Sequence, residues 1–302
     1  MLVEEISAQP GNALERAITR PKISRIRAGV AAVRASADGR PIISHMPRVS
    51  LMVAWQKRLY GKPSRHLAFT FNFTDLPHGP LYRNAWSALH DVSQFTVFSN
   101  FECGLYADHF GLPIERFERL LWTQKPPQYA DQNDFAAPDS YISAVGGEGR
   151  DYATLFNAAA ALPHIPFVIV CRPHNPLPDI PANVTVHTNL DGLKTWRIVK
   201  DSASTVVPLK SAETCCGHIT IVGAELLGVP IVATRSAATT EYTEDVVLCE
   251  PGDPCALAES IQRTYESAQI LREQSMLAIP AKIAKYDRKL WQNSIETFLS
   301  IP

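Results

Sequence analysis

A glycine opens a helix-length apolar segment within VVPLKSAETCCGHITIVGAELLGVPIVAT, residues 206–234. A glycine at a helix start lets a phosphate group approach the free N–H groups and the positive end of the helix dipole. The candidate residues here are Lys210, which adds a cation, and the helix opening Gly217, His218, Ile219 and Thr220. A glycine alone would more often mark only an ordinary helix start. Together with its neighbours it predicts a phosphate site.

Two arginines follow runs that are typical of buried strands. SYISAVGG at residues 140–147 ends in Gly146 and Gly147, and Arg150 stands three positions later. PFVIVC at residues 166–171 is followed directly by Arg172. Ligands of an open parallel sheet bind beyond the carboxyl ends of its strands. Both arginines are therefore candidates for binding a phosphate or a sugar.

Groups able to move a proton follow two apolar runs in the first half of the chain. RPIISH at residues 40–45 ends in His45, and the loop after SRHLAFTFNF offers Asn72, Asp75 and His78. A carboxylate or imidazole there could take a proton from a substrate hydroxyl. Alternatively, His45 caps its strand and Asp75, which precedes Leu76-Pro77, belongs to a turn.

These residues need two α/β units to position them. Strands are predicted at residues 140–147, 166–171, 183–187, 204–209 and 230–234, with helices at residues 151–162 and 217–227 between them. This βαβ order predicts a parallel, doubly wound sheet. The first half reads as a second, smaller unit with strands at 40–45, 64–73 and 94–100. A Pro-rich stretch near residue 125 is typical of a linker and predicts domains 1–128 and 129–280. A final helix is predicted at 281–300 and is expected to pack back on the first domain.

Three blocks in the second half resemble the donor-binding domain of the family-4-like GT-B glycosyltransferases. They are SAVGGEGRDYATLFNAAAAL, the stretch at 206–234, and TRSAATTEYTEDVVLCEPGDPCALAESI. The resemblance implies two Rossmann-like domains facing a cleft, the first of them reduced. It places Arg150 with Gly146 and Gly147 on the donor phosphates, and Glu241 at a turn of the donor site. The block FTVFSNFECGLYADHFGLPIERFERLLW adds Ser99 on the acceptor side.

The donor segment departs from the family pattern at two positions. The family commonly carries two glutamates eight residues apart, the second of which holds donor hydroxyls. Cys215 and Gly223 stand at those places. Glu225 lies two positions further on, rotated by roughly 200° around a helix of 3.6 residues per turn. We expect it to face solvent.

Composition excludes several other classes of protein. No run reaches the roughly 18 uncharged apolar residues that a membrane span needs, and the first 30 residues do not read as a signal peptide, so a cytoplasmic protein is expected. The six cysteines lack metal-ligand spacing, which predicts no metal site. Residues 1–128 carry 16 Lys and Arg against 10 Asp and Glu. This excess could favour an anionic membrane surface, although a solvated helix face explains it equally. The basic residues of the early segment are Arg16, Arg20, Lys22, Arg25, Arg27 and Arg34.

The sequence as a whole predicts a glycosyltransferase. It would move a sugar from a nucleoside-diphosphate sugar to a hydroxyl of a glycan, lipid-linked sugar or protein, in bacterial polysaccharide or glycoconjugate synthesis. No cofactor and no nucleic-acid partner are expected, and the resemblance implies retention of configuration. Two alternatives stay open: a nucleotide-sugar 2-epimerase, and an inactive partner subunit with the same fold.

Overall fold

The computed structural model describes residues 4–17, 22–61, 63–79, 86–132, 138–242 and 246–301. The chain divides into two compact units. The first comprises Met1–Leu121 with Asn293–Pro302, and the second is Trp122–Gln292. The change of unit after Leu121 precedes the Pro-rich residues 125–128.

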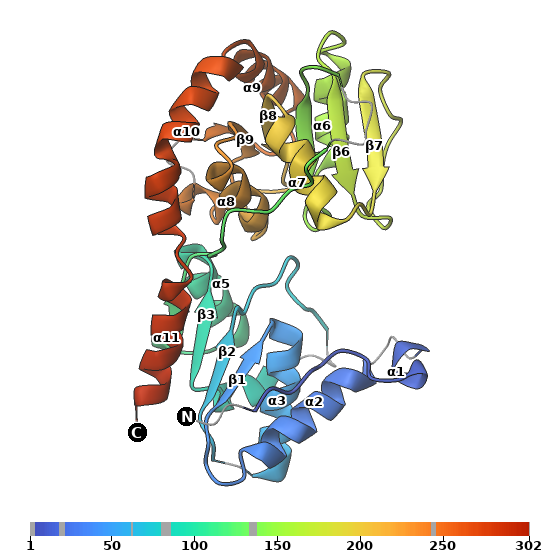
Figure 1. Ribbon diagram of the computed structural model, residues 1–302. Helices are drawn as coiled ribbons and strands as arrows, with labels where there is room; N and C mark the ends of the chain where they lie inside the picture. Colours follow the sequence, from blue (N-terminus) through green and yellow to red (C-terminus); the bar gives the residue numbers. More distant parts are fainter. Residues whose placement is uncertain are drawn as a thin grey trace. The chain divides into compact units, whose positions relative to one another are not determined.

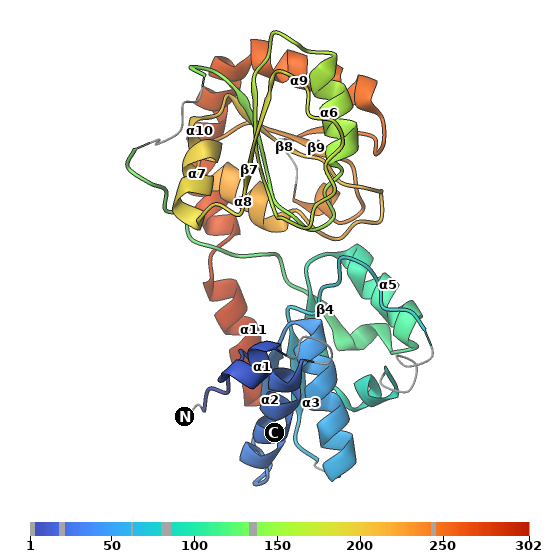
Figure 2. The ribbon, with the colours of Figure 1, turned by 90° about the vertical axis from the view of Figure 1, so that its right-hand side faces the viewer.

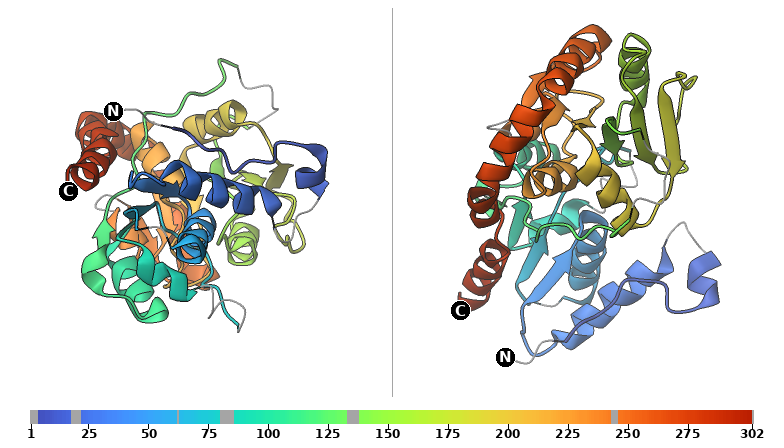
Figure 3. Two further views of the ribbon diagram at one scale, coloured as in Figure 1. Left: turned by 90° about the horizontal axis from the view of Figure 1, so that it is seen from below. Right: turned by 45° about the horizontal axis from the view of Figure 1, so that its top comes forward.

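The first unit is built on a four-stranded parallel sheet in the order β1-β2-β3-β4 (Figure 1). Helices α2 and α3 lie alongside each other in this unit (Figure 3). The three predicted strands are confirmed as β1, β2 and β3, whereas β4 was not predicted. The elements are α1 (Ala13–Ala17), α2 (Ile23–Ala35), β1 (Ile42–His45), α3 (Pro47–Tyr60), β2 (His66–Phe69), η1 (Ser87–Asp91), β3 (Gln94–Val97), α5 (Asn100–Phe110), η2 (Ile114–Arg116) and β4 (Phe117–Arg119).

Aromatic side chains dominate the core of this unit. Phe71 is fully buried, and its ring lies edge-on to Phe95 and Tyr106 at centroid separations of 4.9 and 5.7 Å. Such edge-to-face pairs stabilise a core beyond the area they bury. Phe71 and Phe73, which follow β2, therefore serve core packing.

The second unit holds a six-stranded parallel sheet in the order β10-β9-β8-β5-β6-β7. Numbered within the unit, this is the Rossmann order 3-2-1-4-5-6, and the order reverses between β5 and β8. The five predicted strands are confirmed, and β10 is an addition. The elements are β5 (Ile142–Val145), α6 (Tyr152–Ala160), β6 (Phe167–Cys171), β7 (Val184–Thr188), α7 (Gly192–Asp201), β8 (Ser204–Val207), α8 (His218–Leu226), β9 (Ile231–Thr234), η3 (Thr239–Glu241), β10 (Val247–Cys249), α9 (Pro254–Glu266) and α10 (Ala268–Lys285).

Helices cover both faces of this sheet. Figure 2 shows α6 on one side of the strands and α7 with α8 on the other. The start of α9 carries a side-chain cap. Asp253 accepts a hydrogen bond from the Ala256 N–H at 2.9 Å, and Pro254 occupies the first turn of α9. These two residues mark where this helix begins.

The end of the chain forms two helices where the sequence predicted a single one at residues 281–300. Helix α10 ends at Lys285, and α11 runs over Lys289–Ser300. Within the first unit, Phe298 lies under the guanidinium of Arg65 at 4.5 Å, and the Ser294 hydroxyl donates to Glu118 at 2.9 Å. The last residues thus pack on the strands of the first unit.

Candidate functional site

The point where the strand order reverses brings two predicted segments together. Strands β5 and β8 are neighbours, so the loops that follow them begin side by side. The Asp151 N–H donates to the Pro208 oxygen at 3.0 Å, and the Lys210 N–H donates to the Gly149 oxygen at 3.2 Å. These bonds tie the loop carrying Arg150 to the loop that leads to α8.

Helix α8 begins at this edge without a side-chain cap. Gly217, its N-cap residue, has φ of 99°, and an added Cβ would lie 3.0 Å from Cγ1 of Val207. Only glycine combines that backbone with so close an approach. Ile219 is 52% exposed, and since its side chain has no polar group, only its backbone N–H could donate to a phosphate. An uncapped helix start of this kind favours an anion.

Arg150 lies directly behind that helix start and is 94% buried, with an exposed fraction of 6%. Its Nη2 donates to Thr220 Oγ1 at 3.1 Å and to the Val145 oxygen at 3.3 Å, and its Nη1 donates to the Glu148 oxygen at 3.2 Å. In the part of the chain that the structure describes, no carboxylate pairs with this guanidinium. Because a buried charge needs a counter-charge, the site is electrostatically suited to an anion.

Two predicted residues of α8 are buried near Arg150. Thr220 is buried, and its hydroxyl both accepts from Arg150 and reaches the Val145 oxygen at 3.4 Å. His218 is also buried, and burial together with the nearby charge of Arg150 lowers its pKa to about 3. The imidazole is therefore neutral near pH 7. The Thr220 hydroxyl thus holds Arg150, and the His218 ring packs against that of Tyr242. Direct contact of either side chain with a ligand stays a prediction.

The remaining predicted donor-side residues lie after neighbouring strands. Lys210 is exposed after β8, and its ammonium group makes no hydrogen bond or ion pair with the described residues. Arg172 follows β6 and donates to Asn189 Oδ1 at 2.9 Å. Glu241 ends η3, which follows β9. Gly146 leaves room for the guanidinium of Arg150, because a Cβ at this position would lie 2.6 Å from Arg150 Nη2. A Cβ on Gly147 would meet the side chain of Arg172.

The expectation that Glu225 faces solvent is wrong. Its carboxylate is buried and forms an ion pair with Lys282 at 2.7 Å, while the Tyr286 hydroxyl donates to its other oxygen at 2.5 Å. The cause is tertiary, because α10 covers that face of α8. The carboxylate thus serves packing of two helices.

Gly223 has a neighbour that the sequence did not indicate. A Cβ there would lie 2.1 Å from Cη2 of Trp196 and 2.9 Å from Nε2 of Gln124. Both side chains therefore occupy the space beside α8 where the family pattern has a glutamate. No local signal marks this contact, because the three residues come from separate segments.

In the first unit, two acceptor-side candidates belong to a buried network around Glu102. Ser99 caps α5 by accepting from the Glu102 N–H at 3.2 Å, and its hydroxyl donates to the Glu102 carboxylate at 2.8 Å. Asn72 Nδ2 donates to the same carboxylate at 2.7 Å, and the Tyr106 hydroxyl donates at 3.0 Å. Ser99 and Glu102 thus pair at the start of α5 in the manner of a capping box, and Asn72 links this pair to the loop after β2. Burial raises the pKa of Glu102.

The candidate proton-transfer residues of this unit are more dispersed. His45 ends β1, and burial lowers its pKa. Asp75 and His78 lie in the loop after β2, where the His78 ring is 5.6 Å from that of His109. Among the described residues, no hydrogen bond or ring contact joins His45 to Asp75 or His78. Their catalytic role stays a prediction.

Backbone strain gathers at the carboxyl ends of strands in both units. Three described non-glycine residues have positive φ: Met46 at 74°, Thr70 at 54° and Asn189 at 56°. Each directly follows a strand, namely β1, β2 and β7. Such strain often accompanies functional loops. The observation agrees with ligand binding at these edges.

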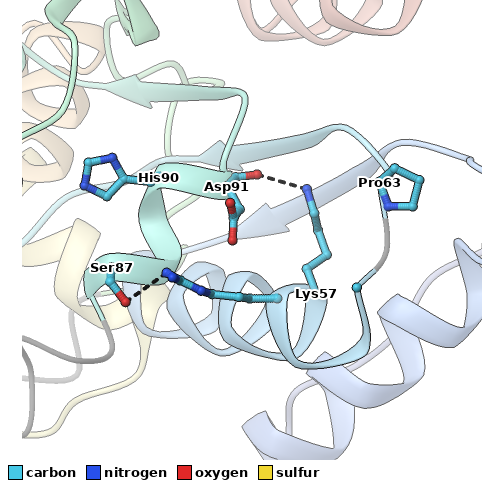
Figure 4. Close-up of a pocket in the computed structure, with 7 residues that line it drawn as sticks. Lys57, Pro63, Ser87, His90 and Asp91 are labelled. Carbon is cyan, nitrogen blue, oxygen red and sulfur yellow. Dashed lines mark hydrogen bonds between the residues drawn. The ribbon is translucent and has the colours of Figure 1, made fainter.

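A hollow of about 600 Å³ in the first unit does not suit a phosphate (Figure 4). Lys57 uses its ammonium group on the backbone oxygens of Ser64 and of Asp91, the latter at 2.9 Å, and Arg58 donates to Ser87 Oγ at 2.9 Å. The hollow lies at the C-terminal end of α3, where the helix dipole opposes an anion. Its cations thus stabilise the loops around them.

The described residues offer neither a metal cluster nor a helix that could span a membrane. No group of three or more His, Cys, Asp or Glu could hold a metal ion there. No helix among them is long and apolar enough to cross a bilayer. In the basic early segment, Arg20 lies outside the described residues, and Arg27 pairs with Glu15 at 2.9 Å.

No family model and no curated protein matches this sequence. Solved structures do match it in fold. HepE of Anabaena in complex with UDP-glucose has a TM-score of 0.74 at 14% identity, over 99% of this chain and 86% of that chain. Sucrose-phosphate synthase of Thermosynechococcus elongatus has 0.71 at 15% identity, over 96% and 80%. A glycosyltransferase of Rickettsia africae has 0.65 at 11% identity, over 96% and 83%.

Proposed function

Since the chain has the fold of the GT-B glycosyltransferases, we propose that it transfers a sugar from a nucleoside-diphosphate sugar to a hydroxyl acceptor. One observation carries the proposal: Arg150, a buried cation with no carboxylate partner among the described residues, lies behind the uncapped start of α8. This pair of features offers a diphosphate both a charge and free N–H groups. The complex of HepE with UDP-glucose supports the class of donor.

The chemistry assigned to these residues is stabilisation of the leaving group. When the bond between the sugar and the diphosphate breaks, negative charge grows on the diphosphate oxygen. The N–H groups at Gly217 and Ile219, the dipole of α8 and the positive charge of Arg150 would stabilise that oxygen before and after the bond breaks. Lys210, which is exposed at the same loop, would screen the outer phosphate. The acceptor hydroxyl loses its proton to a base or to the departing phosphate.

The acceptor, the stereochemistry and the membrane contact are finer parts of the same proposal. Resemblance to the retaining group supports retention of configuration, and a glycan, lipid-linked sugar or protein would supply the hydroxyl. The excess of basic over acidic residues in residues 1–128 supports contact with an anionic bilayer. Sedimentation with anionic and neutral vesicles tests that contact.

Incubation with a panel of nucleotide sugars, followed by mass spectrometry, tests the proposal. We expect release of nucleoside diphosphate from one donor and slower release by Lys210→Ala. The exposed Lys289 supplies the matched control, because Lys289→Ala removes a charge outside the site. An epimerised sugar formed without acceptor would identify a 2-epimerase instead. Unchanged turnover in both Lys210→Ala and Arg150→Ala would refute the assignment of the donor site.

A further inference from the structure

At Gly223 of α8, the space that a longer side chain would fill is occupied by the indole of Trp196, which belongs to α7. Gly223 is the sixth residue of α8, and Trp196 of α7 lies over it so closely that even a methyl group would collide at 2.1 Å. Gln124 closes the same space from the other side, with its Nε2 at 2.9 Å from that methyl position. Glycine is thus required at this point for the indole to lie where it does.

Core packing does not account for every feature of this cluster. The α8 residues beside Gly223 are fully buried, whereas Trp196 and Gln124 are each partly exposed. Within the described part of the chain, the indole N–H of Trp196 has no hydrogen-bond partner. Gln124 uses its Oε1 to accept from Trp122 Nε1 at 2.8 Å, and its amide N–H groups make no hydrogen bond with described residues. An aromatic face and two polar groups are therefore available to a ligand.

The cluster lies within reach of a ligand held at the start of α8. Gly223 follows Gly217 by six residues, which at 1.5 Å per residue is about 9 Å along the helix axis. That length is comparable with the span from a diphosphate to the far edge of its nucleoside. A nucleoside attached to a diphosphate at Gly217 would extend beside Trp196.

The charge of this surface sets what it can recognise. A carboxylate at position 223 could accept hydrogen bonds from both hydroxyls of a ribose, but glycine stands there. The nearest carboxylate along α8, that of Glu225, is engaged by Lys282 and Tyr286. The surface at Gly223 is neutral and aromatic, which suits stacking better than recognition of a diol.

We propose that the indole of Trp196, with the amide of Gln124, is the nucleoside-binding surface of the donor site, and that it accepts ribose and 2′-deoxyribose nucleotides alike. This inference rests on the proposed function, because it assumes a diphosphate at Gly217. The substrate class it names is a nucleoside-diphosphate sugar selected by stacking of its base, with little contribution from the 2′-hydroxyl.

Calorimetric titration of the full chain with UDP, 2′-deoxy-UDP and inorganic pyrophosphate tests the proposal. Wild type should bind UDP and 2′-deoxy-UDP with affinities within about threefold of each other, and both more tightly than pyrophosphate. Removing the indole in Trp196→Ala should weaken binding of both nucleotides by about tenfold or more, the range of base–aromatic stacking. Pyrophosphate should bind the variant as it binds wild type, because it reaches only the phosphate site.

Two further variants separate stacking from packing. Trp196→Phe keeps an aromatic face and should retain most of the affinity for UDP. Gly223→Ala keeps the indole in the chain but displaces it, so it should reproduce the loss seen in Trp196→Ala. Wild-type affinity for UDP in both Trp196→Ala and Gly223→Ala would overturn the proposal. A preference of wild type for UDP over 2′-deoxy-UDP by more than about tenfold would also overturn it.

The outcomes also separate this inference from the proposed function. If wild type binds neither nucleotide nor pyrophosphate, the donor site itself is refuted and this inference with it. If wild type binds pyrophosphate as tightly as UDP, the phosphate site stands and the nucleoside surface at Trp196 is refuted alone.

Discussion

Replacing Lys282 by methionine tests how the buried carboxylate of Glu225 is stabilised. In the native structure the Lys282 ammonium group lies 2.7 Å from one oxygen of Glu225, and both side chains are less than a tenth exposed. Methionine would leave the carboxylate with only the Tyr286 hydroxyl, at 2.5 Å, as a donor. Breaking one partner out of a buried pair typically costs about 3–5 kcal/mol. We expect the free energy of unfolding of the second unit to fall by about that amount.

The double variant Glu225→Leu with Lys282→Met is the matched control. Apolar replacement of both partners of a buried pair is often neutral or stabilising, so its stability should lie within about 1 kcal/mol of wild type or above it. Urea denaturation followed by circular dichroism measures all three proteins. The difference between the single and double variants gives the cost of the unpaired carboxylate.

Two outcomes would refute the reasoning. One is a loss of less than about 1 kcal/mol in Lys282→Met. The other is a double variant that is destabilised as much as the single one.

Three other expectations follow from the buried groups. Burial is the main reason why the pKa of His66 and that of His218 are both lowered to about 3. Between pH 3 and 6.5 the unfolded chain therefore binds more protons than the folded chain. Acidification through this range should lower the free energy of unfolding by about 1.4 kcal/mol per pH unit for each histidine, as measured by urea denaturation. Burial raises the pKa of Glu102. The stability of wild type should therefore fall as pH rises above the unfolded value of about 4.3. Glu102→Gln should not show this fall in thermal melts. Gly146→Ala meets both a φ of 129° and the Arg150 guanidinium at 2.6 Å; it should lower stability by about 2 kcal/mol and weaken UDP binding, and unchanged calorimetric affinity would contradict the placement of Arg150.

Much of the second unit could be predicted because its signals are local. A short apolar run such as residues 166–171 marks a buried parallel strand, and Asp253 with Pro254 marks a helix start within a few residues. The start of α8 at Gly217 was predicted for the same reason, since the backbone conformation there depends on that residue and its neighbours. The short edge strands β4 and β10 were missed, because three residues carry too little pattern to be recognised.

The burial and contacts of the site residues could not be predicted from the sequence, because they depend on the tertiary structure. Whether Glu225 faces water depends on α10, which comes more than forty positions later in the chain and covers that face of α8. The burial of Arg150 and the contact of Trp196 with Gly223 likewise join segments distant in sequence. Periodicity shows which residues share one face of a helix, but not which element covers that face. The sequence therefore determined the order of the main strands and helices and the glycine that opens α8. Tertiary packing decided which charges are paired and which aromatic group lies beside α8.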